Sequence, residues 1–119
     1  MIKYESTQTI EKSIKNQIPW KICFMELVDD FRATKDFSLI EKEPKLENCQ
    51  EKALLCSIVL ALCNEQNIEA PAWAWEKHFL PKPWFVSGIK NLYATAIIES
   101  PVWFKKNNIF VLGNFLNRV

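Results

Sequence analysis

The longest apolar stretch of the chain lies near its middle and predicts a buried helix. From Ala53 to Cys63 every side chain except that of Ser57 is apolar. A helix that is apolar on all sides must be enclosed by other elements. The stretch is shorter than the roughly 20 residues that cross a bilayer, and it ends in the polar run Asn64-Glu65-Gln66-Asn67. We therefore expect a core helix over about residues 47–66 and no membrane anchor.

Amphipathic periodicity predicts two helices before this core helix. Ile10, Ile14 and Ile18 recur every four residues, which is the spacing of one helix face. Pro19 ends that short helix and is suited to the first turn of the next one. From Trp20 to about Ala33, apolar side chains form one wide face and charged side chains occupy the opposite face. We expect this second helix to cover one side of the core helix.

The segment after the core helix is rich in proline and tryptophan. Residues 68–85 contain three prolines and three tryptophans, namely Pro71, Pro81, Pro83, Trp73, Trp75 and Trp84. Proline at this density prevents a long helix, and aromatic rings are too large to leave in water. The pattern predicts an ordered Pro/Trp-rich strap pressed onto the core, with one helical turn at Ala72 to Lys77.

The last third of the chain predicts shorter elements. A helix is expected from Ile89 to Glu99, with an inner face formed by Leu92, Tyr93, Ala96 and Ile97. Ser100-Pro101 begins a further turn or two. Ile109 to Leu112 is an apolar run of strand type without a partner strand in the sequence. Asn114 to Val119 has the pattern of a final helical turn.

Together these elements indicate an all-α fold. We expect a compact single-domain helical bundle over residues 1–119, in which the helix at Trp20 to Ala33, the strap and the helix at Ile89 to Glu99 clasp the core helix. A chain of 119 residues fits one domain. Two glycines and a 49 % share of hydrophobic residues argue against a turn-rich all-β architecture and against disorder.

Charge and cysteine placement restrict the functional classes. The 15 basic and 14 acidic residues leave a net charge of +1, so no strong global field attracts nucleic acid or an anionic membrane. Cys49, Cys56 and Cys63 recur on the predicted core helix with about 10 Å between neighbours, too far apart to form a disulfide or share a metal ion. Cys23 could pair with one of them. We favour buried thiols in a reduced, cytoplasmic protein.

No catalytic motif accompanies this architecture. The glycine-rich phosphate loops, the GxSxG turn and the HExxH zinc motif are all missing from the sequence. His78 is the only histidine, and a solvent-facing or capping role is favoured over that of a general base. An enzyme would have to unite His78 with Glu76 or with Glu26 and Asp30, which share a helix face. We expect no catalytic residues, metal site or cofactor, and keep a small enzyme near His78 as an alternative.

Lysines near the C-terminus offer a second alternative, a nucleic-acid-binding accessory domain. In Trp103-Phe104-Lys105-Lys106 two lysines follow aromatic rings, which can stack on bases. The candidate contact residues are Lys82, Lys90, Lys105 and Lys106. Lysines that close a helix also complement its macrodipole, and this structural interpretation is favoured.

The number of tryptophans gives the most useful functional indication. Five tryptophans in a chain of this size exceed what one core can enclose, and an exposed aromatic patch marks a protein interface. We therefore expect a non-catalytic cytoplasmic module, antitoxin-like or regulatory, that binds another protein or a second copy of itself. The predicted contact residues are Trp73, Trp75, Trp84 and Trp103.

Spaced aromatic and proline elements also suggest a family. They are Pro71-Ala72-Trp73, Phe79-Leu80 followed by Pro83-Trp84-Phe85, Ser100-Pro101 with Phe104, Asn108-Ile109-Phe110-Val111 and the closing Leu116-Asn117-Arg118. Over about residues 20–119 the chain resembles a widespread family of small uncharacterised bacterial proteins, in which an acidic-proline element like Glu43-Pro44 precedes the central helix. The resemblance implies a partner of a nucleotidyltransferase-type toxin or an appendage of a helix-turn-helix repressor. It assigns no catalytic residues.

Overall fold

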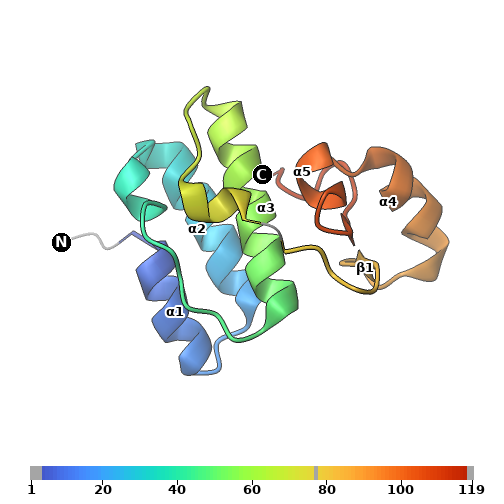
Figure 1. The fold of residues 1–119 in the computed structure, drawn as a ribbon, viewed down its shortest axis with the longest axis horizontal. Helices are drawn as coiled ribbons and strands as arrows, with labels where there is room; N and C mark the ends of the chain where they lie inside the picture. The colour runs from blue at the N-terminus through green and yellow to red at the C-terminus, as the bar shows by residue number, and fades with distance from the viewer. Residues whose placement is uncertain (1–3, 77, 118–119) are drawn as a thin grey trace.

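Helices dominate the structure, which confirms the helical part of the predicted fold class. The computed structural model describes residues 4–76 and 78–117, and 55 % of these residues are helical. The molecule measures 44 × 31 × 29 Å along its principal axes. Helices α1 (Thr7–Lys15), α2 (Trp20–Thr34) and α3 (Cys49–Glu65) lie at one end, and α4 (Tyr93–Glu99) and α5 (Val102–Lys105) lie at the other (Figure 1).

The first helix is fixed by its N-terminal cap and is shorter than the isoleucine spacing predicts. Ser6 and Thr9 form a capping box, in which each side-chain hydroxyl accepts a hydrogen bond from the other residue's backbone N–H. The predicted extension to Ile18 is wrong. Gln17 adopts a positive φ of 64°, and the N–H of Ile18 bonds back to the carbonyl of Ser13. The helix therefore closes before Ile18, whose side chain is exposed.

The second helix agrees with its predicted bounds to within one residue. Pro19 precedes its first turn, and Lys35 ends it in the left-handed conformation with a φ of 54°. Its buried face consists of Cys23, Phe24, Met25, Leu27, Val28 and Phe31. The 3₁₀ turn η1 (Phe37–Leu39) follows and contacts α2.

The apolar stretch forms α3, and its burial follows the sequence pattern. The side-chain oxygen of Asn48 caps the helix by accepting from the backbone N–H groups of Gln50 and Glu51, at 2.9 and 3.1 Å. Every residue from Ala53 to Leu60 is buried, because α2, α5 and the 3₁₀ turn η2 (Ala72–Trp75) all pack against this helix. No helix in the described part of the chain combines the length and the apolar character needed to span a bilayer.

The strap after α3 is ordered around Trp73. The indole Nε1–H of Trp73 donates to the carbonyl oxygens of Ile40 and Glu41, at 3.0 and 3.2 Å. The predicted helical turn is the 3₁₀ turn η2, which ends at Trp75. Lys77, the last residue of the predicted turn, lies outside the described residues.

The C-terminal helices differ from the prediction in which of them covers the core. The predicted single helix is divided into η3 (Lys90–Leu92) and α4, which contact each other and leave Ile97 exposed. Helix α5 takes the predicted place against α3 and inserts the fully buried Phe104. Pro101 separates the two helices because it breaks the chain's helical path between them. The buried hydroxyl of Ser100 accepts a hydrogen bond from the Val111 N–H at 2.7 Å.

The apolar run near the C-terminus does find a strand partner. Strand β2 (Ile109–Phe110) pairs in parallel with β1 (Trp84–Phe85), with Trp84 opposite Ile109 and Phe85 opposite Phe110. The N–H of Trp84 donates to the carbonyl of Asn108 at 3.0 Å, which closes the strap onto the C-terminal segment. The chain after β2 forms a turn; Arg118 and Val119, the end of the predicted final helical turn, lie outside the described residues.

Candidate functional site

Trp75 of η2, which is exposed, and Trp103 of α5, which is half-buried, are in contact at the surface. Trp75 is 50 % exposed, and the centre of its ring lies 5.9 Å from that of the half-buried Trp103. The two rings are nearly perpendicular, at 76°. The ammonium group of Lys106 lies over the Trp75 ring, with Nζ 5.0 Å from the ring centre. Such an edge-to-face pair holds both rings in a fixed orientation at the surface.

Beside this pair the surface is hollowed into a groove of about 260 Å³. We call it the Trp75–Trp103 groove; its walls include Leu60, Cys63, Ile68, Glu69, Trp75 and Trp103. Leu60 and Cys63 come from the last turns of α3 and are buried, whereas Ile68 and Glu69 come from the following loop and are exposed. The groove therefore has an apolar floor, aromatic walls and a polar rim.

The four tryptophans predicted as contact residues differ in exposure and in their neighbours. Trp73 is only 6 % exposed, so its prediction as a contact residue is wrong: the residue is anchored in the core by its indole hydrogen bonds. Trp84 is half-buried in β1 and packs edge-on against Trp20, with ring centres 5.8 Å apart. Trp75 and Trp103 are the predicted pair that the structure brings together.

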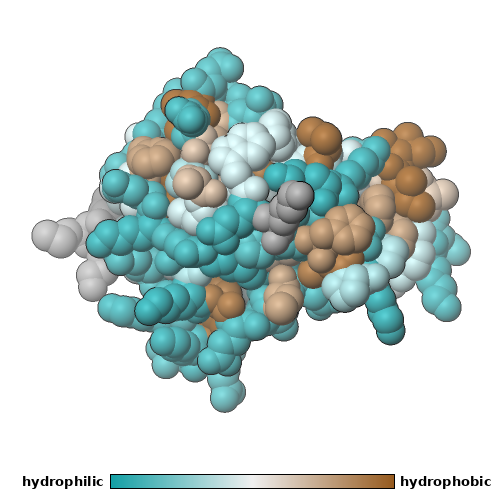
Figure 2. Space-filling view, in the orientation of Figure 1, coloured by the Kyte–Doolittle hydropathy of each residue, from teal (hydrophilic) through white to brown (hydrophobic). Residues whose placement is uncertain are grey.

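Exposed aliphatic side chains that the sequence reasoning missed lie on the C-terminal helices. Ile98 on α4 is 78 % exposed, and Val102, next to Trp103 on α5, is also exposed. Ile97 was expected to face the core but is exposed as well, because α4 is short and buries only Ala96. Hydrophobic side chains gather over the α4 end of the molecule (Figure 2). No periodic signal separated Ile97 from Ile98, because adjacent helix positions can share a wide buried face, as Leu27 and Val28 do on α2.

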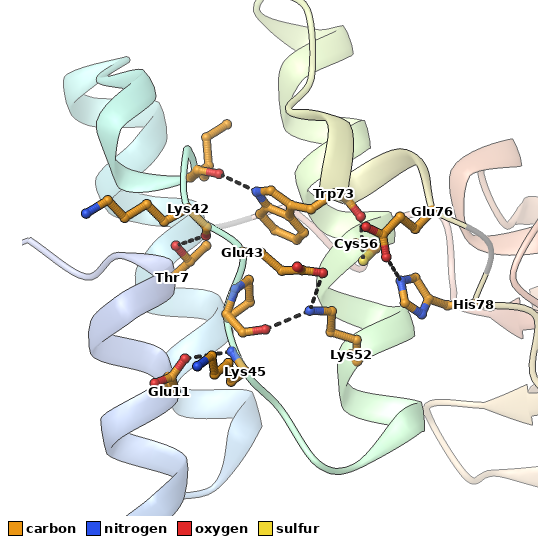
Figure 3. A network of polar contacts seen from close by, with 12 residues as sticks. Thr7, Glu11, Lys42, Glu43, Lys45, Lys52, Cys56, Trp73, Glu76 and His78 are labelled. Carbon is orange, nitrogen blue, oxygen red and sulfur yellow. Dashed lines mark hydrogen bonds and ion pairs between the residues drawn. The ribbon is translucent and has the colours of Figure 1, made fainter.

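His78 lines a separate cavity of about 440 Å³, which we call the His78 cavity. Its walls include Leu46, Cys49, Lys52, His78, Phe79 and Leu80. Figure 3 shows Glu76 and His78 pointing toward each other, and Glu76 Oε2 lies 3.7 Å from His78 Nε2. Lys52 Nζ donates to the carboxylate of Glu43 at 3.2 Å and to the carbonyl of Pro44 at 2.6 Å.

Among the residues that the structure describes, His78 has no hydrogen bond of the kind that activates a general base. His78 is half-buried instead of solvent-facing, yet its Nε2 is a buried atom without a hydrogen-bond partner among the described residues. The ammonium group of Lys52 is already paired with Glu43 and Pro44. A general base needs a positioned proton donor or orienting group within hydrogen-bond reach. The enzyme alternative required a contact between His78 and Glu76, and their nearest side-chain atoms lie 3.7 Å apart, beyond hydrogen-bond distance. A small enzyme near His78 therefore stays a prediction.

The cysteines are free thiols, and one of them departs from the expected burial. Cys49 is exposed at the first turn of α3, because only the later turns of this helix are enclosed. Cys23, Cys56 and Cys63 are buried as expected. Burial raises the pKa of the Cys56 thiol to about 12 and that of Cys63 to about 11, so both remain protonated at neutral pH.

The carboxylates of Glu26 and Asp30 on α2 lie next to Glu5 in the N-terminal segment. Asp30 accepts a hydrogen bond from the backbone N–H of Glu5 at 2.7 Å. Burial raises the pKa of the Glu5 carboxyl, and the neighbouring carboxylates of Glu26 and Asp30 act in the same direction. Within the described ranges, no group of three or more His, Cys, Asp or Glu side chains is placed to hold a metal ion.

The four lysines of the nucleic-acid alternative come from three segments. Lys82 lies in the loop before β1, Lys90 begins η3, and Lys105 and Lys106 close α5. Lys106 is engaged with the Trp75 ring. A continuous basic face made by all four side chains stays a prediction.

Comparisons with family models, with curated proteins and with solved structures find no match to this chain. The family resemblance therefore stays a prediction, and function is argued from geometry. Within the chain, the motif residues Trp73, Ser100 and Phe104 are buried structural contacts.

Proposed function

We propose that this chain is a non-catalytic module that binds a partner protein through the Trp75–Trp103 groove and the neighbouring exposed side chains of α4 and α5. The observation that carries the proposal is the half-exposed Trp75, held edge-to-face by Trp103 beside an apolar hollow. Tryptophans in this setting, with an apolar centre and a polar rim, are enriched among residues that dominate binding energy.

The size of the expected effect follows from the area that a partner would cover. Covering the exposed half of the Trp75 side chain removes on the order of 100 Å² of largely apolar surface from water, which contributes about 2–3 kcal/mol. Val102, next to Trp103 on α5, and Ile98 on α4 add exposed aliphatic area. The Trp75–Trp103 pair requires little ordering on binding because the two rings already restrain each other.

The scaffold and cellular role belong to the same proposal. A single-domain helical bundle around α3 presents the surface, in a cytoplasmic protein with an antitoxin-like or regulatory role. The partner is another protein or a second copy of this chain.

A capture experiment with matched variants tests the proposal. Tagged wild-type chain, Trp75→Glu and Ile22→Glu are incubated with lysate of the source organism, and the retained proteins are quantified by mass spectrometry. Ile22 on α2 is a suitable control because it is 52 % exposed, matching Trp75, and does not line the groove. A protein retained by wild type and by Ile22→Glu, and lost with Trp75→Glu, is then purified and titrated against each variant.

We expect Trp75→Glu to weaken binding of that purified partner roughly 30- to 100-fold, since about 2–3 kcal/mol of apolar burial is lost. Ile22→Glu leaves the affinity unchanged. Sedimentation velocity covers self-association: a wild-type dimer becomes monomeric in Trp75→Glu alone. If all three chains are monomeric and retain the same proteins, the groove is not a protein-binding surface.

A further inference from the structure

The Trp75–Trp103 groove has the composition of a site for a positively charged organic group. Two indole rings at 76° to each other line its wall. Among the described residues that line the groove, Glu69 is the charged one, and it sits on the exposed rim. Indole faces attract cations through the ring quadrupole, and a carboxylate at the edge adds an attraction of the same sign.

Lys106 indicates what kind of cation the Trp75 ring accepts. Its Nζ lies 5.0 Å from the ring centre, within the range of a cation–π contact. Lys106 follows the last residue of α5 and is not among the groove's lining residues. A primary ammonium group on a flexible chain thus already rests on this ring, from inside the same molecule.

We propose that the Trp75–Trp103 groove binds an alkylammonium group, a methylated lysine side chain presented by the partner. Methylated ammonium groups suit such a site because their methyl groups contact the apolar floor at Leu60 while the charge faces the indole rings. Glu69 selects for positive charge at the rim. This inference rests on the proposed function, because the partner protein supplies the methylated lysine.

Titration with small probes tests the ammonium chemistry directly. Choline is compared with 3,3-dimethyl-1-butanol, its neutral isostere, by following the indole N–H resonances of the ¹⁵N-labelled chain. We expect saturable shifts confined to the resonances of Trp75 and Trp103, with choline binding at least about tenfold more tightly than the isostere. Equal affinity of the two probes would mean that the groove recognises apolar shape alone, and the proposal would be wrong.

Three variants assign the effect to residues, and circular dichroism checks that each remains folded. Trp75→Leu retains an apolar wall without the π face and is expected to weaken choline binding roughly tenfold. Glu69→Gln, on the exposed rim, weakens it about threefold. Lys106→Gln removes a like charge beside the Trp75 ring, which lowers electrostatic repulsion of the probe, and tightens binding about threefold. Unchanged affinity in Trp75→Leu, or weaker binding in Lys106→Gln, would overturn the proposal; Ile22→Ser serves as the unaffected control.

A peptide titration distinguishes a protein source of the ammonium group from a small-molecule source. Together with the capture experiment, it also distinguishes failure of this inference from failure of the proposed function. A trimethyllysine-containing peptide that binds more tightly than both choline and the unmethylated peptide supports a protein source. Choline binding as tight as that of the peptide identifies a free small molecule and contradicts the protein source. If Trp75-dependent partner capture succeeds while choline binds no better than its isostere, the partner-binding function stands and the ammonium inference fails.

Discussion

The buried hydrogen bond between Ser57 and Asn107 predicts how Ser57→Ala changes the stability of the protein. The sequence pattern suggests that this substitution stabilises the protein, whereas the structure predicts that it destabilises it. Ser57 is the one polar residue in the apolar stretch of α3, so replacing it with alanine looks favourable from the sequence. In the structure the Asn107 amide donates to the Ser57 hydroxyl at 2.9 Å, and that hydroxyl donates to the carbonyl of Ala53 at 3.0 Å. Both polar side chains are buried, Ser57 fully and Asn107 to within 1 %.

The magnitude follows from what Ser57→Ala leaves behind. The Asn107 amide keeps only the carbonyl oxygen of Ala53, at 3.5 Å, which is too long for a good hydrogen bond. Leaving a buried donor unsatisfied costs about 1–3 kcal/mol, whereas the higher helix propensity of alanine returns up to roughly 0.5 kcal/mol. We therefore expect Ser57→Ala to lower the free energy of unfolding by about 1–2 kcal/mol, and Tm to fall by about 4 °C per kcal/mol.

Urea unfolding followed by circular dichroism measures this change, with a double-mutant cycle to isolate the bond. Ser57→Ala, Asn107→Ala and the double variant should give a coupling energy of about 1 kcal/mol. Thr95→Ala on the exposed face of α4 is the control and is expected to be neutral or slightly stabilising. A Ser57→Ala variant as stable as the wild type, with no coupling to Asn107, would refute the reasoning.

Three further predictions follow from the described contacts. In the native protein, Ellman's reagent should label one thiol, that of the exposed Cys49, and the remaining thiols only after unfolding in urea; rapid labelling of several thiols would contradict the buried positions. Arg32 donates two hydrogen bonds to Glu65, at 2.9 and 2.8 Å, and holds the pKa of that carboxyl below its ordinary value of 4.5. Glu65→Gln should therefore lower the free energy of unfolding by up to about 1 kcal/mol at pH 7. The difference in urea midpoint between this variant and wild type should disappear as the pH falls below 4.5, through the lower pKa of Glu65 in the folded state. A difference that stays constant with pH would exclude the ion pair as its cause. Trp73→Phe removes the indole donor of two backbone carbonyls and should lower the free energy of unfolding by about 2–3 kcal/mol in the same urea assay, while a loss below about 0.5 kcal/mol would show that those bonds contribute little.

Local pattern was enough to place the main helices. Residues 53–63 are apolar at nearly every position, and an all-round apolar helix can exist only where other elements enclose it. The proline before Trp20 acts through its immediate neighbours, so the start of α2 could be read from the sequence. The core helix was expected from about residue 47 and begins at Cys49, after the cap at Asn48. The end of α1 could not, because Gln17 closes it by a positive φ that no local pattern required.

Pairings between distant segments were beyond the sequence. Strands β1 and β2 each extend over two residues, too few for an alternating pattern, and their pairing depends on the strap folding back onto the C-terminal segment. Helix α4 was expected on the core because its pattern has an apolar face, but α5 packs against α3 and inserts the buried Phe104.

The sequence by itself determined that this chain is predominantly helical around a buried apolar segment and that it has more tryptophan than a small core needs. Only the tertiary structure decided which tryptophans are exposed. Trp73 and Trp75 stand two positions apart in a proline-rich strap that has no regular period, so no pattern assigns one inward and the other outward. Their difference comes from what surrounds them: backbone carbonyls of a distant loop accept the indole N–H of Trp73, whereas Trp75 meets Trp103 and solvent.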